Sequence, residues 1–191
     1  LMCGIVGYIG PRDATPIILN GLKRLEYRGY DSAGLAILNG GQLEVRKDAG
    51  KLSQLIDLVH KSPISGAPGI GHTRWATHGA PNARNAHPHL GQTKRVVVVQ
   101  NGIVENFLEL KDELMAEGVE SCSETDTETI VHLVEHYLAT GIGLVEAARQ
   151  TFKQIQGANV VVLMSADEPD KIVTARIGNA GGVVLGLGEG E

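Results

Sequence analysis

Cys3 is the residue best placed by its position to do chemistry, because it directly follows the first methionine, Met2. Removal of the residues before it would give Cys3 a free α-amino group beside its thiol, so that one residue carries both a nucleophile and a base. An α-amine titrates near about 7.8 and a thiol near about 8.5, so a proton can pass between them. The alternative is a small buried residue that opens a core strand.

Four histidines, His72, His78, His87 and His89, raise the alternative of a metal site. Zinc sites use cysteine or well-spaced histidine with acidic support, and the His87-Pro88-His89 sequence has poor spacing for this. We therefore expect no metal and no other cofactor. The chain has two cysteines, too few for a disulfide framework, and Cys122 is expected to be structural.

The composition is that of one globular domain. The 191 residues include 17 Lys and Arg against 22 Asp and Glu, a net charge of -5, and 42% are hydrophobic. No basic cluster exceeds two residues, so nucleic acid is not an expected partner. The longest apolar run, near Val96 to Val99, is too short to cross a bilayer, and the first residues lack signal-peptide features. We expect a cytoplasmic protein without membrane contact.

Hydrophobic periodicity predicts the strands and helices that must position Cys3 and the histidines. The polar segment 28–34 is predicted as a loop between a helix and a hairpin. Four consecutive valines make 94–100 the strongest strand and indicate burial on both faces. The expected strands are 3–9, 35–38, 43–47, 70–75, 94–100, 160–165, 172–176 and 183–187, and the expected helices are 14–27, 51–60, 104–117, 127–138 and 144–155.

Strands at both ends of the chain with helices grouped between them fit a layered α+β architecture with largely antiparallel sheets. Segments 76–79 and 81–92 are expected to be loops. The last residues, 185–191, resemble the start of a hairpin whose return strand is missing. The prediction is one domain over residues 1–191, incomplete at its C-terminus.

Five short motifs follow one another along the chain, and together they resemble a known family. They are CGIVG at 3–7, YRGYDSAG at 27–34, HTRWATHG at 72–79, NGI at 101–103 and SETDTE at 123–128. The chain is similar over nearly its whole length to the glutaminase (type 2 glutamine amidotransferase) domain of the glucosamine-6-phosphate synthase family. The first and fourth motifs are shared with other amidotransferases that use an N-terminal cysteine, whereas the second and third point to the hexosamine-forming enzymes.

This resemblance implies a four-layer αββα N-terminal nucleophile hydrolase fold and hydrolysis of L-glutamine to glutamate and ammonia. In the full-length enzyme, which it implies is a homo-oligomer, a separate isomerase domain absent from this chain delivers the ammonia to fructose 6-phosphate. Two alternatives stay open. One is a catalytically silent glutamine-binding or regulatory module, and the other is the glutaminase half of another amidotransferase, such as amidophosphoribosyltransferase.

The resemblance also implies catalytic roles for three residues. Cys3 attacks the side-chain amide of glutamine, and its own α-amine takes the thiol proton and passes it to the departing ammonia. Asn101 and Gly102 follow a buried strand, which suits a side-chain amide and a backbone N–H directed at an oxyanion. Taken alone, Asn-Gly favours a hairpin turn, so the oxyanion role rests on the resemblance.

A site for glutamine must also pair the α-carboxylate and the α-ammonium of the amino acid. The family positions assign the carboxylate to Arg74, whose guanidinium is a bidentate donor, and the ammonium to Asp126. Asp126 has the alternative role of a helix N-cap. The resemblance further implies that Trp75, Thr77 and His78 contact the substrate or belong to a lid that excludes water.

Arg28 and the carbonyl of Gly29 are expected, from the resemblance, to hold the terminal amine and the active-site backbone. The alternative for Arg28 is a structural ion pair with Asp31. Gln100 departs from the family, which commonly has histidine before Asn-Gly, and we expect this change to retune the oxyanion loop without removing it.

A larger departure lies at the start of the chain, where Leu1 and Met2 precede Cys3. If both residues stay attached, Cys3 has no free amine and the mechanism loses its base. We therefore expect the native product to begin at Cys3.

Overall fold

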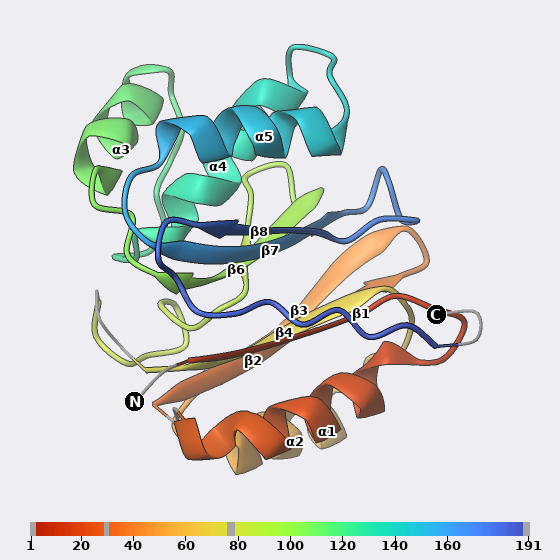
Figure 1. Cartoon of the computed structure of the whole chain (residues 1–191). Helices are drawn as coiled ribbons and strands as arrows, with labels where there is room; N and C mark the ends of the chain where they lie inside the picture. Colours follow the sequence, from red (N-terminus) through yellow and green to blue (C-terminus); the bar gives the residue numbers. More distant parts are fainter. Residues whose placement is uncertain (1–2, 29–30, 76–78, 189–191) are drawn as a thin grey trace.

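Two antiparallel β-sheets stack on each other, and helices cover the outer face of each sheet, so four layers follow one another through the molecule (Figure 1). The structure is a computed structural model and describes residues 3–28, 31–75 and 79–188. The α+β class and the αββα order of layers expected from the sequence are both confirmed.

The first sheet has the strand order β1-β4-β2-β3, and all neighbouring strands are antiparallel. Its strands are β1 (Gly4–Tyr8), β2 (Ser32–Asn39), β3 (Gln42–Ala49) and β4 (Gly69–Arg74). The glycines at 40 and 41 form the predicted hairpin turn between β2 and β3. β1 lies at one edge of the sheet, and Cys3 directly precedes it.

Two helices cover the outer face of this sheet (Figure 1). They are α1 (Ala14–Leu25), which continues into the short 3-10 helix η1 (Glu26–Arg28), and α2 (Leu52–Lys61). Asp13 caps α1, because its side chain accepts a hydrogen bond from the backbone N–H of Thr15. The apolar faces of both helices pack on the sheet and bury Ile18, Leu22, Leu52 and Leu55.

The second sheet has the order β5-β6-β7-β8 and is also antiparallel. Its strands are β5 (His89–Leu90), β6 (Val96–Gly102), β7 (Asn159–Ser165) and β8 (Val173–Ile177). The valines of β6 are buried on both faces, as predicted. Val96 and Val98 belong to the core under the helices, whereas Val97 and Val99 belong to the core between the two sheets.

Three helices cover the outer face of the second sheet: α3 (Phe107–Ala116), α4 (Thr127–Leu138) and α5 (Leu144–Gln154) (Figure 1). α4 lies directly on the sheet and is buried along most of its first two turns. None of the helices in the described part of the chain has the length and apolar character that a bilayer crossing requires.

The predicted loop over 28–34 is partly wrong, because β2 begins at Ser32. A Cβ atom on Gly34 would lie 2.2 Å from the carbonyl oxygen of His87, so this glycine is needed for the close approach of the strand to that segment. Similarly, residues 81–92 are not entirely loop, since His89 and Leu90 pair with Val98 and Val97 of β6. Both differences depend on neighbours that are distant in the sequence.

The predicted strand over 183–187 is also wrong. This segment runs as extended chain past β1 (Figure 1) and has no strand assignment. Its side chains are exposed, with Val184 at 94% and Leu187 at 96%. A strand is defined by ladder hydrogen bonds with a neighbour, and within the described residues this segment pairs with none.

Candidate active site

The ends of strands from both sheets converge on one cavity of about 1080 Å³. Cys3 precedes β1, and Arg74 is the last residue of β4 in the same sheet. Asn101 and Gly102 are the last residues of β6 in the other sheet, and Asp126 directly precedes α4. All five line the cavity, so the structure brings together residues that the sequence separates by more than 120 positions.

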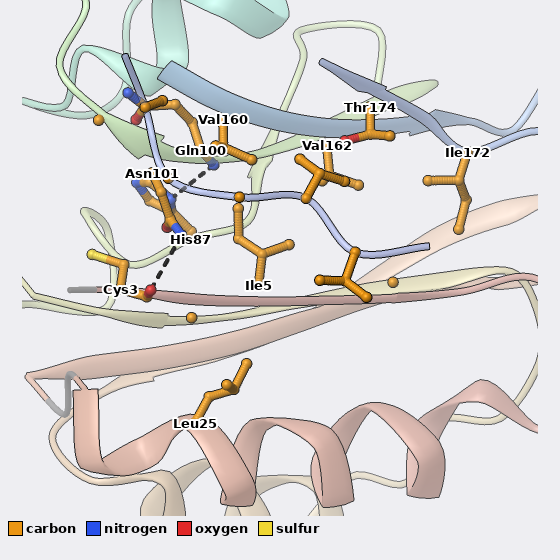
Figure 2. Close-up of a pocket in the computed structure, with 18 of the residues that line it drawn as sticks. Cys3, Ile5, Leu25, His87, Gln100, Asn101, Val160, Val162, Ile172 and Thr174 are labelled. Carbon is orange, nitrogen blue, oxygen red and sulfur yellow. Dashed lines mark hydrogen bonds between the residues drawn. The ribbon is translucent and has the colours of Figure 1, made fainter. Parts of the chain in front are cut away.

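The thiol of Cys3 lies at one end of this cavity, and apolar side chains that include Ile5, Val160, Val162 and Ile172 lie further along it (Figure 2). The backbone N–H of Trp75 donates a hydrogen bond to Cys3 Sγ over 3.1 Å. Burial raises the pKa of the Cys3 thiol, and this outweighs the Trp75 hydrogen bond and the positive charge of Arg74, which lower it. The thiol therefore needs a base to become a nucleophile.

The side-chain amide of Asn101 is held at both ends. Its Nδ2 donates to the backbone carbonyl of Cys3 over 3.2 Å (Figure 2), and its Oδ1 lies 2.8 Å from Nε2 of His72. Burial lowers the pKa of His72 to about 4, so the ring is neutral at neutral pH. Because Oδ1 can only accept, the His72 ring carries its proton on Nε2 and donates it. This bond keeps the donor end of the amide toward Cys3.

Gly102 adopts a φ of +135°, a conformation open to glycine and strained for any other residue. A Cβ atom here would also lie 2.1 Å from the carbonyl oxygen of Ala158. Asn101 and Gly102 pair with Val160 and Asn159 of β7, so they belong to a strand and not to a hairpin turn. The turn alternative is therefore excluded.

Arg74 and Asp126 bring opposite charges to the cavity wall, although both residues are nearly fully buried. Burial lowers the pKa of the Arg74 guanidinium, and the carboxylates of Asp31 and Asp126 partly offset this effect. Nη2 of Arg74 donates to the carbonyl of Gly79 over 3.3 Å. Asp126 stands at the N-cap position of α4, but its side chain makes no capping bond and accepts from the backbone N–H of Val104 over 2.7 Å. The carboxylate is therefore not used as a helix cap.

Trp75 follows Arg74 directly and lines the cavity with its side chain partly exposed. Arg28 is the last residue of η1, and its side chain lies outside the described part of the structure. Gly29, Thr77 and His78 also lie outside the described residues. The roles expected for these four residues and for Trp75 stay predictions, as does the choice of partner for Arg28.

Two further histidines lie buried beside the site. His87 Nε2 is 3.1 Å from the hydroxyl of Thr127, and His89 Nε2 is 3.0 Å from the hydroxyl of Thr125. Burial lowers the pKa of both rings well below the usual value for histidine, so both are neutral. Within residues 3–28, 31–75 and 79–188, no group of three or more His, Cys, Asp or Glu is arranged to hold a metal ion.

The contact between His72 and Asn101 was missed in the sequence, where His72 entered only as a possible metal ligand. A signal was present, because His72 and Arg74 are two residues apart on one strand and therefore lie on the same face. Nothing in the sequence indicates that this face meets Asn101, which belongs to the other sheet.

Comparison with known proteins identifies the family and supports the fold. Residues 72–179 match the family model described as a glutamine amidotransferase domain. Relatives named glutamine--fructose-6-phosphate aminotransferase [isomerizing] include those of Caldanaerobacter subterraneus subsp. tengcongensis, at 51% identity over 190 residues, and Thermus thermophilus, at 53% over 190 residues. Each alignment covers all of this chain but 31% of the relative, so the chain spans less than a third of the length of these relatives.

Solved structures show the same fold at lower identity. The glutamine phosphoribosylpyrophosphate amidotransferase from B. subtilis superposes with a TM-score of 0.72 at 25% identity, covering 86% of this chain and 35% of that one. A structure titled as the allosteric regulatory enzyme of purine biosynthesis gives a TM-score of 0.73 at 27% identity over the same shares. The chain therefore belongs to the glutamine amidotransferase domain family and has the αββα fold of the N-terminal nucleophile hydrolases.

Proposed function

We propose that this chain is a glutaminase domain that hydrolyses L-glutamine to glutamate and ammonia, with Cys3 as the nucleophile. The observation that carries the proposal is the convergence of groups on one cavity: a thiol, the Asn101-Gly102 pair, and the opposite charges of Arg74 and Asp126. An amino acid with a side-chain amide matches this set, because it carries a carboxylate, an ammonium and an electrophilic carbonyl.

The first step requires a base at Cys3. Burial raises the pKa of the thiol, and a free α-amine on the same residue would accept its proton once Leu1 and Met2 are removed. Sγ then bonds to the amide carbon of glutamine, the C–N bond breaks, and the amine returns the proton to the departing ammonia. Water hydrolyses the resulting thioester to glutamate and restores the thiol. We propose that Arg28 and Gly29 hold the terminal amine in place.

The tetrahedral intermediate carries negative charge on the former carbonyl oxygen. We assign its stabilisation to Nδ2 of Asn101 and the backbone N–H of Gly102. Support comes from the hydrogen bond that fixes the Asn101 amide toward Cys3 and from the restricted backbone of Gly102. These donors are fixed before the charge develops, which is the condition under which they lower the barrier.

Recognition of glutamine is assigned to Arg74 for the α-carboxylate and to Asp126 for the α-ammonium. Both side chains are desolvated, so each interaction with a charged ligand group is stronger than it would be on the surface. Trp75, Thr77 and His78 are proposed to contact the substrate or to close over it and exclude water.

We further propose that the ammonia aminates fructose 6-phosphate in a longer protein, through an isomerase domain beyond residues 1–191. The relatives named for that reaction are about 50% identical to this chain, whereas the amidophosphoribosyltransferase structure is 25% identical. We also propose that the full-length enzyme is cytoplasmic and homo-oligomeric. Neither nucleic acid nor a membrane enters the proposal.

The test is ammonia release from glutamine by protein whose first residue is Cys3, set against the chain that retains Leu1 and Met2. We expect activity in the first form and a loss of at least about a hundredfold in the second, because the base is missing. A chloromethyl ketone analogue of glutamine should alkylate Cys3 in the active form, which peptide mass analysis would locate.

The result also separates the enzyme from a silent glutamine-binding module. Glutamine binding without ammonia release, in protein that begins at Cys3, would contradict the enzymatic proposal. Equal activity in the form that retains Leu1 and Met2 would contradict the role of the α-amine.

A further inference from the structure

A continuous chain of hydrogen bonds begins at Thr127 and Gln100 in the cavity wall and uses none of the residues assigned to glutamine. Thr127 Oγ1 donates to Gln100 Oε1 over 2.6 Å, and Gln100 Nε2 donates to Asn159 Oδ1 over 2.6 Å. Nδ2 of Asn159 then donates to the carbonyl of Ile103 over 3.1 Å. Thr127, Gln100 and Asn159 are each at most 3% exposed. The chain links the start of α4 to the segment that follows β6.

The direction of every bond in this chain is fixed by the groups present. Because the Thr127 hydroxyl gives its proton to Gln100, the nearby Nε2 of His87, at 3.1 Å, must donate to Thr127. The neutral His87 ring then has an unprotonated Nδ1, which accepts from the backbone N–H of Gln100 over 3.5 Å (Figure 2). An amide flip at Gln100 or Asn159 would set two acceptors or two donors against each other.

Asn159 is packed directly against Gly102. The two residues are register partners between β7 and β6, and a Cβ atom on Gly102 would lie 2.7 Å from Asn159 Oδ1. The other end of the same amide holds the carbonyl of the next residue, Ile103. The orientation of the Asn159 side chain therefore determines the course of the backbone from Gly102 to Ile103, where the chain leaves β6.

We propose that Gln100 and Asn159 are positioning residues, which hold the backbone N–H of Gly102 in the direction that the oxyanion requires. The proposal rests on the glutaminase function proposed above. The chain of bonds also connects the residue proposed to bind the α-ammonium with a proposed oxyanion donor, because Thr127 adjoins Asp126 and the chain ends beside Gly102. Gln100 acts through Asn159 and Gly102, so its loss should affect the reaction step more than the binding of glutamine.

The test compares Gln100→Leu with the parent protein that begins at Cys3. Leucine has a similar volume but cannot orient Asn159, so we expect kcat to fall about tenfold or more and KM for glutamine to change less than about twofold. Alkylation of Cys3 by iodoacetamide involves no oxyanion, and its rate should stay within about twofold of the parent. A change in overall packing would alter all three quantities together.

A second pair of variants keeps the inference testable if Gln100→Leu does not fold. Thr127→Val keeps the shape of the side chain and removes the hydroxyl, whereas Thr127→Ser keeps the hydroxyl. We expect a higher kcat for Thr127→Ser than for Thr127→Val. Thr151→Val is the matched control, because the buried Thr151 hydroxyl donates to the Ala147 carbonyl within α5, away from this chain of bonds, and kcat should not change.

The outcomes separate the two proposals. If the parent is active, two results would overturn the positioning role alone. One is an unchanged kcat in Gln100→Leu. The other is a fall in kcat for Thr151→Val that is as large as the fall for Thr127→Val. A parent without ammonia release would overturn the glutaminase proposal and the inference that depends on it. A lower kcat in Gln100→Leu, with unchanged KM and unchanged reactivity of Cys3 with iodoacetamide, would support both the glutaminase function and the positioning role.

Discussion

The two sheets contribute different kinds of groups to the site. The first sheet supplies Cys3, whose thiol faces the cavity and bonds only with the Trp75 backbone among the described contacts. The second sheet supplies Asn101 and Gly102, and the residues around them, such as Gln100, make several buried hydrogen bonds. The proposed nucleophile is open to the cavity, and the proposed oxyanion donors lie in or beside a network of hydrogen bonds.

This difference predicts which substitutions should abolish activity and which should lower it by degrees. The proposed nucleophile has no substitute among the described residues of its sheet, whereas Asn101 is one of two proposed oxyanion donors. Charge stabilisation depends on the placement of a donor as well as on its presence, so we expect the second sheet to be sensitive to substitutions that only displace the proposed donors.

The largest expected effect is that of Cys3→Ala in protein that begins at this position. Ammonia release should fall by at least about a thousandfold, because no other described thiol lines the cavity and the covalent route is lost. Steady-state ammonia assays would measure the loss. Far-UV circular dichroism should be unchanged. Ammonia release above a hundredth of the parent's would mean that another residue is the nucleophile. The contrast between a sheet that supplies the nucleophile and a sheet that supplies the oxyanion donors would then be wrong.

Asn101→Ala should have the next largest effect. Loss of one oxyanion donor lowers kcat by about a hundredfold to a thousandfold, while Gly102 still supplies the second. KM should change little, because the bond to the oxyanion forms as the reaction proceeds. Measurement of kcat and KM separately is therefore the decisive assay, and a rise in KM at constant kcat would make Asn101 a binding residue instead.

The pH dependence of stability should report the interface between the sheets near the site. Burial lowers the pKa of His72 to about 4, so the folded state stays unprotonated while the unfolded chain binds a proton below about 6.5. The free energy of unfolding should therefore decrease by about 3 kcal/mol from this residue as the pH falls from 6.5 to 4. Urea titrations at several pH values would measure it.

His72→Gln sharpens this prediction, because glutamine can still donate to Asn101 but does not titrate. The decrease between pH 6.5 and 4 should become smaller in this variant. His60→Gln is the control, since His60 is an exposed residue of α2, and it should leave the pH dependence as it was. An equal decrease in His72→Gln and the parent would assign the acid sensitivity to other groups.

The smallest effect is expected for a substitution on the exposed side of α5, away from the residues that both sheets contribute to the site. Glu146 and Arg149 form an ion pair on the exposed side of α5 with N–O distance 2.9 Å, and their side chains are 40% and 62% exposed. Glu146→Gln should change the free energy of unfolding by less than about 0.5 kcal/mol, since solvent screens such pairs. Urea unfolding would check this, and ammonia release should equal that of the parent.

Much of the fold follows from local patterns. The apolar spacing of α4 predicted both of its ends, and the valines of β6 predicted a strand buried on both faces, although its bounds lie two residues later than expected. Period and composition are properties of a short segment. The start of β2 and the short strand β5 were missed, since Gly34 and His89 owe their conformation to distant partners. The predicted strand over 183–187 failed for the same reason, as pairing needs a neighbour.

By itself, the sequence determined the residue types of the site, because a cysteine near the start and five ordered motifs are local facts. Only the tertiary structure decided that Arg74 and Asp126 reach the cavity of Cys3, and that His72 orients Asn101 from the opposite sheet. The chain of bonds from Thr127 to Asn159 was also invisible in the sequence. Hydrogen bonds between separate elements depend on how the strands, sheets and helices pack together, and no short segment encodes that arrangement.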